Sequence, residues 1–303
     1  MGHLPSSSPI KSLICISVIG LPSEFFNFDK QYLDDVSFVT AMTLVLMGNY
    51  CQTGHFGGPL AYTPYCVASH LIGPELGGLK YDYRRPKHPF SDKFMLAGGH
   101  NAPVTYALWM VLGEALYKKH QATGDSKYLA DYDQTLLPID CIGFRRLKQG
   151  METILSENGL TEHPSMTQAK VRGIRALSGH SESTDVTNDV NGGPSGIGIA
   201  TAAGKATFWD IIGAAESPKV MAVEGEFAMT SGHSQEMKTQ AVAQQVGKRL
   251  RVLMSYNNAG IDDELIGGVI QPQYDSYKIV DQWTSYGWNV FTVEDANDMA
   301  QVV

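Results

Sequence analysis

The pattern of hydrophobic and polar residues alternates between helical and strand-like periods along most of the chain. Apolar residues at helical spacing predict helices over residues 32–48, 61–72, 102–120, 199–213, 233–247 and about 275–286. Short apolar runs that end in glycine or polar residues predict strands over residues 94–96, 220–223, 250–255 and 288–293. Strands that alternate with helices are typical of a parallel sheet with helices on both faces. We therefore predict a doubly wound α/β fold with a mostly parallel sheet.

The remaining segments are predicted loops and one extension. Residues 53–59, 80–93 and 179–184 are rich in glycine, proline or polar residues, and residues 121–190 show little periodicity. An apolar run near the N-terminus, Leu13–Leu21, is too short to span a bilayer, so we expect no membrane partner. We predict an N-terminal extension of unknown role over residues 1–30 and one domain over residues 31–303.

The amino-acid composition argues against some classes of function. The chain is 43% hydrophobic and 18% charged, with a net charge of −8 and no basic cluster, so nucleic acid is not expected as a partner. An acidic protein that binds a phosphorylated ligand should use a metal ion and backbone N–H groups for this purpose. None of the four cysteines forms a CxxC pair, and we expect reduced thiols in a cytoplasmic protein.

Three polar residues fall just past predicted strand ends, where parallel sheets bind their ligands: His100, Glu226 and Asn257. Glu226 and Asn257 are 31 positions apart, so one strand–helix–strand step would bring them to the same edge. A carboxylate with an amide oxygen suits Mg²⁺ or Ca²⁺. Spacing alone leaves a second interpretation open, in which Glu226 is a surface acid and Asn257 a turn residue.

Four sequence blocks resemble a known family. Residues 225–232 (GEFAMTSG), followed by Asn257, resemble the thiamine diphosphate motif, which begins Gly-Asp-Gly and ends in an asparagine. Residues 53–59 (TGHFGGP), 92–100 (DKFMLAGGH) and 193–198 (GPSGIG) resemble three further blocks of transketolases, in the same order. The chain therefore resembles the N-terminal, thiamine-diphosphate-binding domain of the transketolase family.

The resemblance implies a cofactor, a metal ion and their ligands. The metal, Mg²⁺ or Ca²⁺, would be held by the side chains of Glu226 and Asn257 and by the backbone carbonyl of Ala259. It would bridge the diphosphate of the cofactor, to which the backbone of residue 227 would also bind. The residues implied in binding thiamine diphosphate are His100, Gly193, Pro194, Ser195, Gly225, Phe227 and Asn257.

Histidines are the candidate catalytic residues. His55, His100 and His180 match three active-site histidines that, in the family, contact the substrate or the diphosphate and help to move protons. Neutral imidazoles suit this task because their pKa lies near the working pH. The other histidines are expected to be ordinary loop residues: His70, His88, His120, His163 and His233.

Three features depart from the family pattern. Glu226 replaces an aspartate and moves the carboxylate by about 1.5 Å, which Mg²⁺ tolerates less well than Ca²⁺. Phe227 replaces a glycine, so its backbone must adopt a compatible conformation. The chain ends at Val303, whereas the family's domain continues through another strand and a loop with a further active-site histidine. We therefore expect a C-terminally truncated domain.

The implied reaction transfers a two-carbon ketol unit from a ketose phosphate to an aldose. In the family, the glutamate that protonates the aminopyrimidine lies on a second, pyrimidine-binding domain. The expected partners are therefore a pyrimidine-domain chain or a second copy in a homodimer, and sugar phosphate substrates. The alternative is an inactive or truncated paralogue that binds a partner.

Some residues also resemble a family of dehydrogenases. Residues 192–198 (GGPSGIG), residues 257–260 (NNAG) and the pair Tyr274 and Lys278 resemble elements of short-chain dehydrogenases. The 17 positions between Asn257 and Tyr274 are too few for that family, and a polar stretch precedes the glycine loop where a strand should stand. The sequence thus disfavours an NAD(P) oxidoreductase.

Overall fold

Two compact units make up the part of the chain that the computed structural model describes, which is residues 28–131, 133–145, 174–214, 218–256 and 279–303. The first, here the sheet unit, comprises Asp92–Gly98 and Gly192–Val302. The second, the helical unit, comprises Phe28–Ser91 and Gly99–Asn191. The single domain over residues 31–303 stays a prediction, and the extension lies almost entirely outside the described residues.

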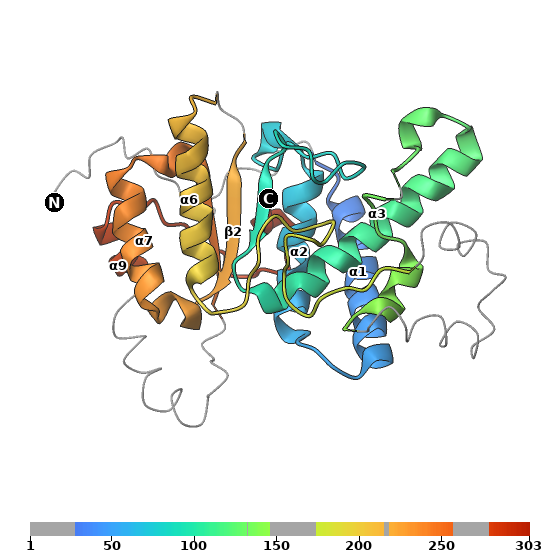
Figure 1. Ribbon diagram of the computed structural model, residues 1–303, viewed down its shortest axis with the longest axis horizontal. Coiled ribbons are helices and arrows are strands. Elements are labelled where there is room, and N and C mark those ends of the chain that lie inside the picture. Colours follow the sequence, from blue (N-terminus) through green and yellow to red (C-terminus); the bar gives the residue numbers. More distant parts are fainter. Residues whose placement is uncertain (1–27, 132, 146–173, 215–217, 257–278) are drawn as a thin grey trace. The chain divides into compact units, whose positions relative to one another are not determined.

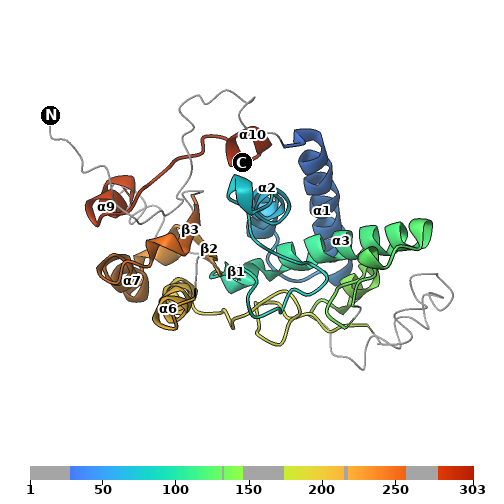
Figure 2. The same cartoon turned by 90° about the horizontal axis from the view of Figure 1, so that it is seen from above.

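A parallel sheet organises the sheet unit. Strands β1 (Lys93–Leu96), β2 (Val220–Gly225) and β3 (Leu250–Ser255) pair in the order β1-β2-β3, all parallel (Figure 2). Their residues are buried almost without alternation, as expected of a parallel sheet covered by other elements. The predicted α/β fold on a parallel sheet is therefore confirmed.

The predicted strand over residues 288–293 is wrong, since only Asn289 forms an isolated bridge there. Its apolar residues serve a different purpose. Trp288 is buried against Trp283 of helix α9 (Ile279–Ser285), with 4.9 Å between the ring centroids. Its indole N–H donates to the backbone carbonyl of Lys238 at 2.8 Å. The run thus anchors a short helix instead of extending the sheet.

Helix α6 (Ile197–Ile211) packs against the sheet, and α7 (Gly232–Ala243) packs against α6 (Figure 1). The predicted helices over residues 199–213 and 233–247 are thus confirmed. Gly198 explains the close approach of α6 to the end of β1, because a Cβ there would lie 2.4 Å from the Cα of Ala97. Three shorter elements complete the unit: 3-10 helices η7 (Phe227–Thr230) and η8 (Val246–Lys248), and helix α10 (Met299–Val302).

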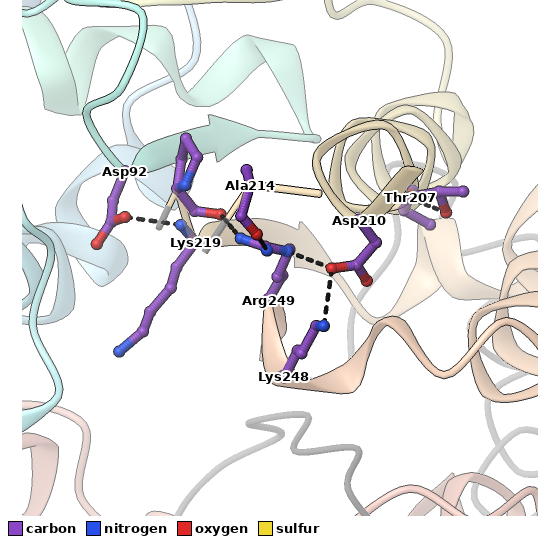
Figure 3. A network of polar contacts seen from close by, with 9 residues as sticks. Asp92, Thr207, Asp210, Ala214, Lys219, Lys248 and Arg249 are labelled. Atoms are coloured by element: carbon purple, nitrogen blue, oxygen red, sulfur yellow. Dashed lines mark hydrogen bonds and ion pairs between the residues drawn. The ribbon is translucent and has the colours of Figure 1, made fainter. Parts of the chain in front are cut away.

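A buried arginine stabilises the amino-terminal edge of the sheet (Figure 3). Arg249, only 2% exposed, donates from Nε to Asp210 of α6, and from its Nη atoms to the carbonyls of Ala214 and Pro218. Lys248 lies 3.3 Å from the same aspartate. These contacts compensate a buried charge and attach the end of α6 to the edge opposite the carboxyl ends of the strands.

Three long helices form the core of the helical unit and pack against one another (Figure 1): α1 (Lys30–Cys51), α2 (Gly57–Leu71) and α3 (Ala102–Thr123). They confirm the three predicted N-terminal helices, although each starts or ends outside its predicted bounds. Helix α1 begins after Asp29, whose carboxylate accepts from the N–H of Tyr32 at 2.9 Å. Four 3-10 helices join the unit: η2 (Pro74–Leu76), η3 (Gly99–Asn101), η4 (Ser126–Tyr128) and η5 (Pro138–Gly143).

The prediction of ordinary loop histidines is partly wrong. His88 does lie in a loop, but His70, His120 and His233 lie in helices α2, α3 and α7. His163 is outside the described residues. A single histidine contributes little to a helical pattern, so its location depends on the residues that flank it.

His70 is a core residue. Its ring packs edge-on against Tyr81 and Trp109, with centroid distances of 5.2 and 5.0 Å, and Nδ1 lies 2.6 Å from the carbonyl of Cys66. Burial lowers the pKa of His70 to about 4, although the backbone contact opposes the shift. His70 is therefore a neutral imidazole that fills the space between α2 and α3.

None of the helices in the described ranges combines the length and the apolarity that crossing a membrane requires.

Candidate functional site

The carboxyl edge of the sheet carries the predicted metal ligand Glu226. Strand β2 ends at Gly225, opposite Ser255 at the end of β3. Glu226 follows at once, and its backbone N–H donates to the carbonyl of Ser255 at 3.2 Å. The side chain is only 4% exposed, so Glu226 is not a surface acid. A buried carboxylate thus lies where the chain leaves β3 towards Asn257.

This carboxylate fits one position of a divalent metal site, because carboxylate oxygens are preferred ligands of Mg²⁺ and Ca²⁺. Asn257 and Ala259, the other two predicted ligands, lie outside the described residues. Within the described ranges, no three His, Cys, Asp or Glu side chains gather as a metal centre would. The structure therefore describes one residue of the predicted ligand set, and its buried carboxylate has the chemistry of a metal ligand.

The phenylalanine that replaces the motif's last glycine sits in an ordinary backbone conformation. Phe227 opens the right-handed 3-10 helix η7, and Glu226 before it has φ −59° and ψ −36°. No left-handed conformation is required, so the side chain of Phe227 adds no backbone strain. A Cβ on Gly225 would meet no atom within 4 Å, which leaves space beside this segment.

The glycine turn ahead of α6 is open to solvent at its start and tightly packed at its end. Gly193, Pro194 and Ser195 are exposed, and a Cβ on Gly193 would again meet no atom within 4 Å. Gly196 has φ +82°, and a Cβ there would lie 1.8 Å from Oγ of Ser231. The predicted cofactor-contacting residues are therefore accessible, while the residue after them is held in one conformation.

Glu224 is a residue that motif reasoning missed. It lies on β2, is 1% exposed, and accepts from the N–H of Gly225 at 3.0 Å through Oε1. Burial raises the pKa of Glu224 to about 7, opposed by hydrogen bonds from the backbone N–H groups of Gly225 and Gly196. Its other oxygen has no hydrogen-bond partner among the described residues. The signal in the sequence is an acid at the end of an otherwise apolar strand.

The helical unit brings the three predicted catalytic histidines together. The ring of His55 lies 5.5 Å from that of His100 and 6.5 Å from that of His180, measured between centroids. The N–H of Ser181 donates to the carbonyl of Gly99 at 2.9 Å, which joins two of the three loops. His55 is exposed and the other two are half-buried. A ligand can therefore reach the cluster.

Two of these imidazoles are held in the neutral form. Burial lowers the pKa of His100, and so do the neighbouring His55 and His180. Burial also lowers the pKa of His180, with further contributions from Arg145 and His55, whereas Glu182 opposes the shift. At neutral pH these rings can accept a proton or donate their remaining N–H, as proton transfer requires.

Arg145 is the second residue that the sequence did not reveal. Its backbone N–H donates to the carbonyl of Leu177 at 2.8 Å, and its guanidinium donates to Oγ1 of Thr53 at 3.3 Å. A Cβ on Gly179 would lie 2.2 Å from Nε of Arg145, so the guanidinium lies directly against this glycine. The pairing joins residues on either side of 146–173, and no local pattern predicts it. It adds a permanent positive charge to the histidine cluster.

A family model matches the C-terminal part of the chain. Residues 165–303 match the model of the family described as transketolase, thiamine diphosphate binding domain. The predicted resemblance to transketolases is therefore confirmed for this stretch, whereas no curated protein matches the chain.

Solved transketolases share the fold of the chain. A transketolase variant from Pichia stipitis is 21% identical, with a TM-score of 0.58, over 90% of this chain and 33% of that one. Transketolase from Leishmania mexicana is 19% identical, with a TM-score of 0.55, over 88% and 33%. The Campylobacter jejuni enzyme is 15% identical, with a TM-score of 0.55, over 87% and 38%. The likeness confirms the doubly wound α/β fold, and the chain spans about a third of the length of these transketolases.

The transketolase match covers the candidate site unevenly. It includes the glycine turn, Glu226 and His180, whereas His55 and His100 precede residue 165. For those two histidines the observation is geometric, since they lie beside His180 in the helical unit. The structure thus brings together the three rings that the sequence blocks and the order of the motifs selected, and their catalytic role stays a prediction.

Proposed function

We propose that the chain binds thiamine diphosphate with a divalent metal ion and forms part of a ketol-transferring active site. The match of residues 165–303 to the thiamine diphosphate binding domain of transketolases is the observation that carries the proposal. The buried carboxylate of Glu226 supports it, because that residue stands at the motif position of the metal ligand. Asn257 and Ala259 would complete the protein ligands of Mg²⁺ or Ca²⁺.

The side chains divide the remaining tasks. When bound, thiamine diphosphate supplies the electron sink that stabilises a carbanion. Gly193, Pro194 and Ser195 would line its aminopyrimidine, and the backbone of Gly225 and Phe227 would approach its diphosphate. The open space beside Gly193 and Gly225 supports this assignment.

The three histidines would act on the sugar substrates. His55, His100 and His180 would donate hydrogen bonds to hydroxyl groups and move protons at the reacting carbon. The lowered pKa of His100 and of His180 favours the neutral rings that this chemistry uses. The proposed reaction moves a two-carbon unit from a ketose phosphate to an aldose in the cytoplasm.

A partner polypeptide belongs to the proposal. In the family, the glutamate that protonates the aminopyrimidine lies on a separate pyrimidine-binding domain, so the proposed active site includes such a domain. The partner would be a pyrimidine-domain chain or a second copy of this chain in a homodimer. Without it, we expect cofactor binding but no ketol transfer.

The test is a fluorescence titration of the full chain with thiamine diphosphate, with Mg²⁺, with Ca²⁺ and with a chelator, beside a titration with NADPH. We expect quenching that depends on the metal, and none with NADPH. A pyrimidine-domain chain added to the loaded protein should then give ketol transfer. Binding without turnover would favour an inactive, partner-binding paralogue, and no metal-dependent binding at all would contradict the proposal.

A further inference from the structure

Helix α1 carries apolar side chains on two sides. Its inner side belongs to the core that α1 forms with α2 and α3, and the residues buried there are Leu33, Thr40, Leu44, Met47 and Cys51. The opposite side, here the α1 outer face, exposes seven large apolar side chains: Tyr32, Phe38, Val39, Met42, Val45, Leu46 and Tyr50. A surface helix is apolar towards the core and polar towards water, so α1 has the pattern of a helix that is covered on both sides.

The exposed side chains form one continuous stripe. Phe38, Met42 and Val45 follow one another at intervals of four and three residues, and Val39, Leu46 and Tyr50 at intervals of seven and four. Residues at these intervals lie on the same side of an α-helix. From Phe38 to Tyr50 the helix rises about 18 Å, so a second helix can pack along it for about three turns.

The α1 outer face is free of charge along this length. Residues 36–51 contain no Asp, Glu, Lys or Arg, although the whole chain has a net charge of −8. In the first turns of α1, Lys30 pairs with Asp34 at 2.8 Å. Two copies of the face can therefore meet without the like-charge repulsion that other surfaces of an acidic protein would cause.

A membrane surface does not suit this face. Helices that lie in a bilayer interface carry lysine or arginine on their polar side, which binds anionic lipids. In α1 the side opposite the exposed stripe is buried within the helical unit, and the only basic residue of the helix is Lys30. The face therefore fits an uncharged protein surface, which a second copy of this chain supplies.

The exposed area is sufficient for a dimer. The seven side chains are between 39% and 67% exposed. Because an aromatic side chain alone offers about 150–250 Å², together they expose on the order of 600 Å². Two copies would bury on the order of 1,200 Å², the size at which specific, stable interfaces begin.

We propose that two copies of this chain associate through the α1 outer face, by pairing of their α1 helices around a two-fold axis. The inference rests on the proposed function to the extent that a second copy is one of the two partners named there. Dimerisation is nevertheless a property of the chain and is measured without cofactor.

The experiment determines the molar mass of the full chain by sedimentation over a range of concentrations. We expect a reversible dimer. Phe38→Glu and Leu46→Glu place a charge at the two most exposed positions of the face, and each should raise the Kd of the dimer by about 30-fold or more. The matched control is Ile211→Glu on α6, a side chain that is 78% exposed, and its Kd should stay within about three-fold.

The variants should keep the circular dichroism of the unmodified chain, because the replaced side chains are exposed. Should a glutamate variant not fold, the double replacement Phe38→Ala and Leu46→Ala takes its place and should raise the Kd by about ten-fold or more. An unchanged Kd in the variants that fold would overturn the inference, and so would a chain that stays monomeric at every concentration.

One further variant tests the N-terminal segment of the same chain as the occupant of the face. In Met42→Cys, a disulfide to Cys15 within one chain would assign the face to that segment and overturn the inference. A dimer that binds no thiamine diphosphate would contradict the proposed function and support this inference. A monomer that binds the cofactor would do the reverse.

Discussion

The sheet unit and the helical unit hold their candidate residues by different physical means. In the sheet unit, Glu226 and the glycine turn follow regular elements, and hydrogen bonds of the parallel ladder fix where those elements end. In the helical unit, His55, His100 and His180 lie in or beside loops that meet through single long-range bonds. Spacing along the sequence therefore predicts positions in the first unit, whereas the second requires motif resemblance as well.

The buried titratable groups differ in the same way. At and just after the end of β2, the sheet unit buries two carboxyl groups, Glu224 and Glu226. The helical unit holds neutral imidazoles, with a lowered pKa at His70, His100 and His180. The first arrangement suits a cation and backbone amides, and the second suits proton transfer to a neutral substrate.

The largest expected effect concerns the carboxylate of the sheet unit. Glu226→Ala should weaken metal-dependent binding of thiamine diphosphate by about 100-fold or more, because a charged metal ligand is lost. Glu226→Asp, which restores the family's residue, should retain binding. Calorimetric titration measures both, with Glu236→Gln on the exposed face of α7 as the control. Equal affinities in the alanine variant and the unmodified chain would remove Glu226 from the site.

The next effect concerns the stability of the helical unit in acid. The pKa of His70 is about 4 in the folded protein, against an ordinary value of 6.5, so the unfolded chain binds the proton more tightly. Stability is therefore complete above pH 6.5 and is lost as the pH falls towards 4, by up to about 3 kcal/mol. Urea unfolding followed by fluorescence of Trp109, which contacts His70, measures the loss at several pH values.

His70→Leu should flatten this pH dependence, whereas His88→Gln, in an exposed loop, should leave it unchanged. A pH dependence that survives in the leucine variant would assign acid sensitivity to other groups. A buried neutral histidine would then no longer explain the acid sensitivity of the helical unit.

A smaller effect is expected from the backbone of the glycine turn. Gly196→Ala forces a side chain onto a left-handed residue and against Ser231, which should cost about 2 kcal/mol of unfolding free energy. Gly204→Ala in the middle of α6 meets no atom within 4 Å and should stabilise the protein by about 0.5–1 kcal/mol. Denaturant midpoints measure both changes. If both substitutions stabilised the protein, the turn would tolerate a side chain at Gly196.

The smallest effect tests Arg145. Its guanidinium is one of the groups that lower the pKa of His180, so Arg145→Leu should raise that pKa. The shift should be a fraction of a unit, because His180 is partly exposed and solvent screens the charge. Titration by NMR measures it, and Lys127→Met provides the control, since Lys127 does not act on His180. An unchanged pKa would place Arg145 outside the cluster's electrostatics.

The sequence predicted the sheet unit well because its signals are local. Apolar runs located β1, β2 and β3, and strand ends located Glu226. The failure at residues 288–293 has a tertiary cause, since Trp288 packs against Trp283 instead of pairing with a strand. An apolar run of that length does not distinguish these outcomes.

The sequence did not reveal two candidate residues, because their surroundings come from distant parts of the chain. Arg145 pairs with Leu177, 32 positions later, and the burial that raises the pKa of Glu224 comes from elements that pack around β2. Neither arrangement produces a periodic pattern in the sequence. Motif resemblance found the three histidines in the helical unit, but it offered no information on the arginine and the glutamate that lie beside the motifs.

The most direct test of the account is the calorimetric binding of thiamine diphosphate to the unmodified chain, with Mg²⁺ and after chelation. We predict saturable binding with Mg²⁺ that chelation abolishes and added Mg²⁺ restores. Absence of binding under both conditions, or binding indifferent to the metal, would contradict the assignment of this chain as a metal-dependent thiamine diphosphate-binding domain.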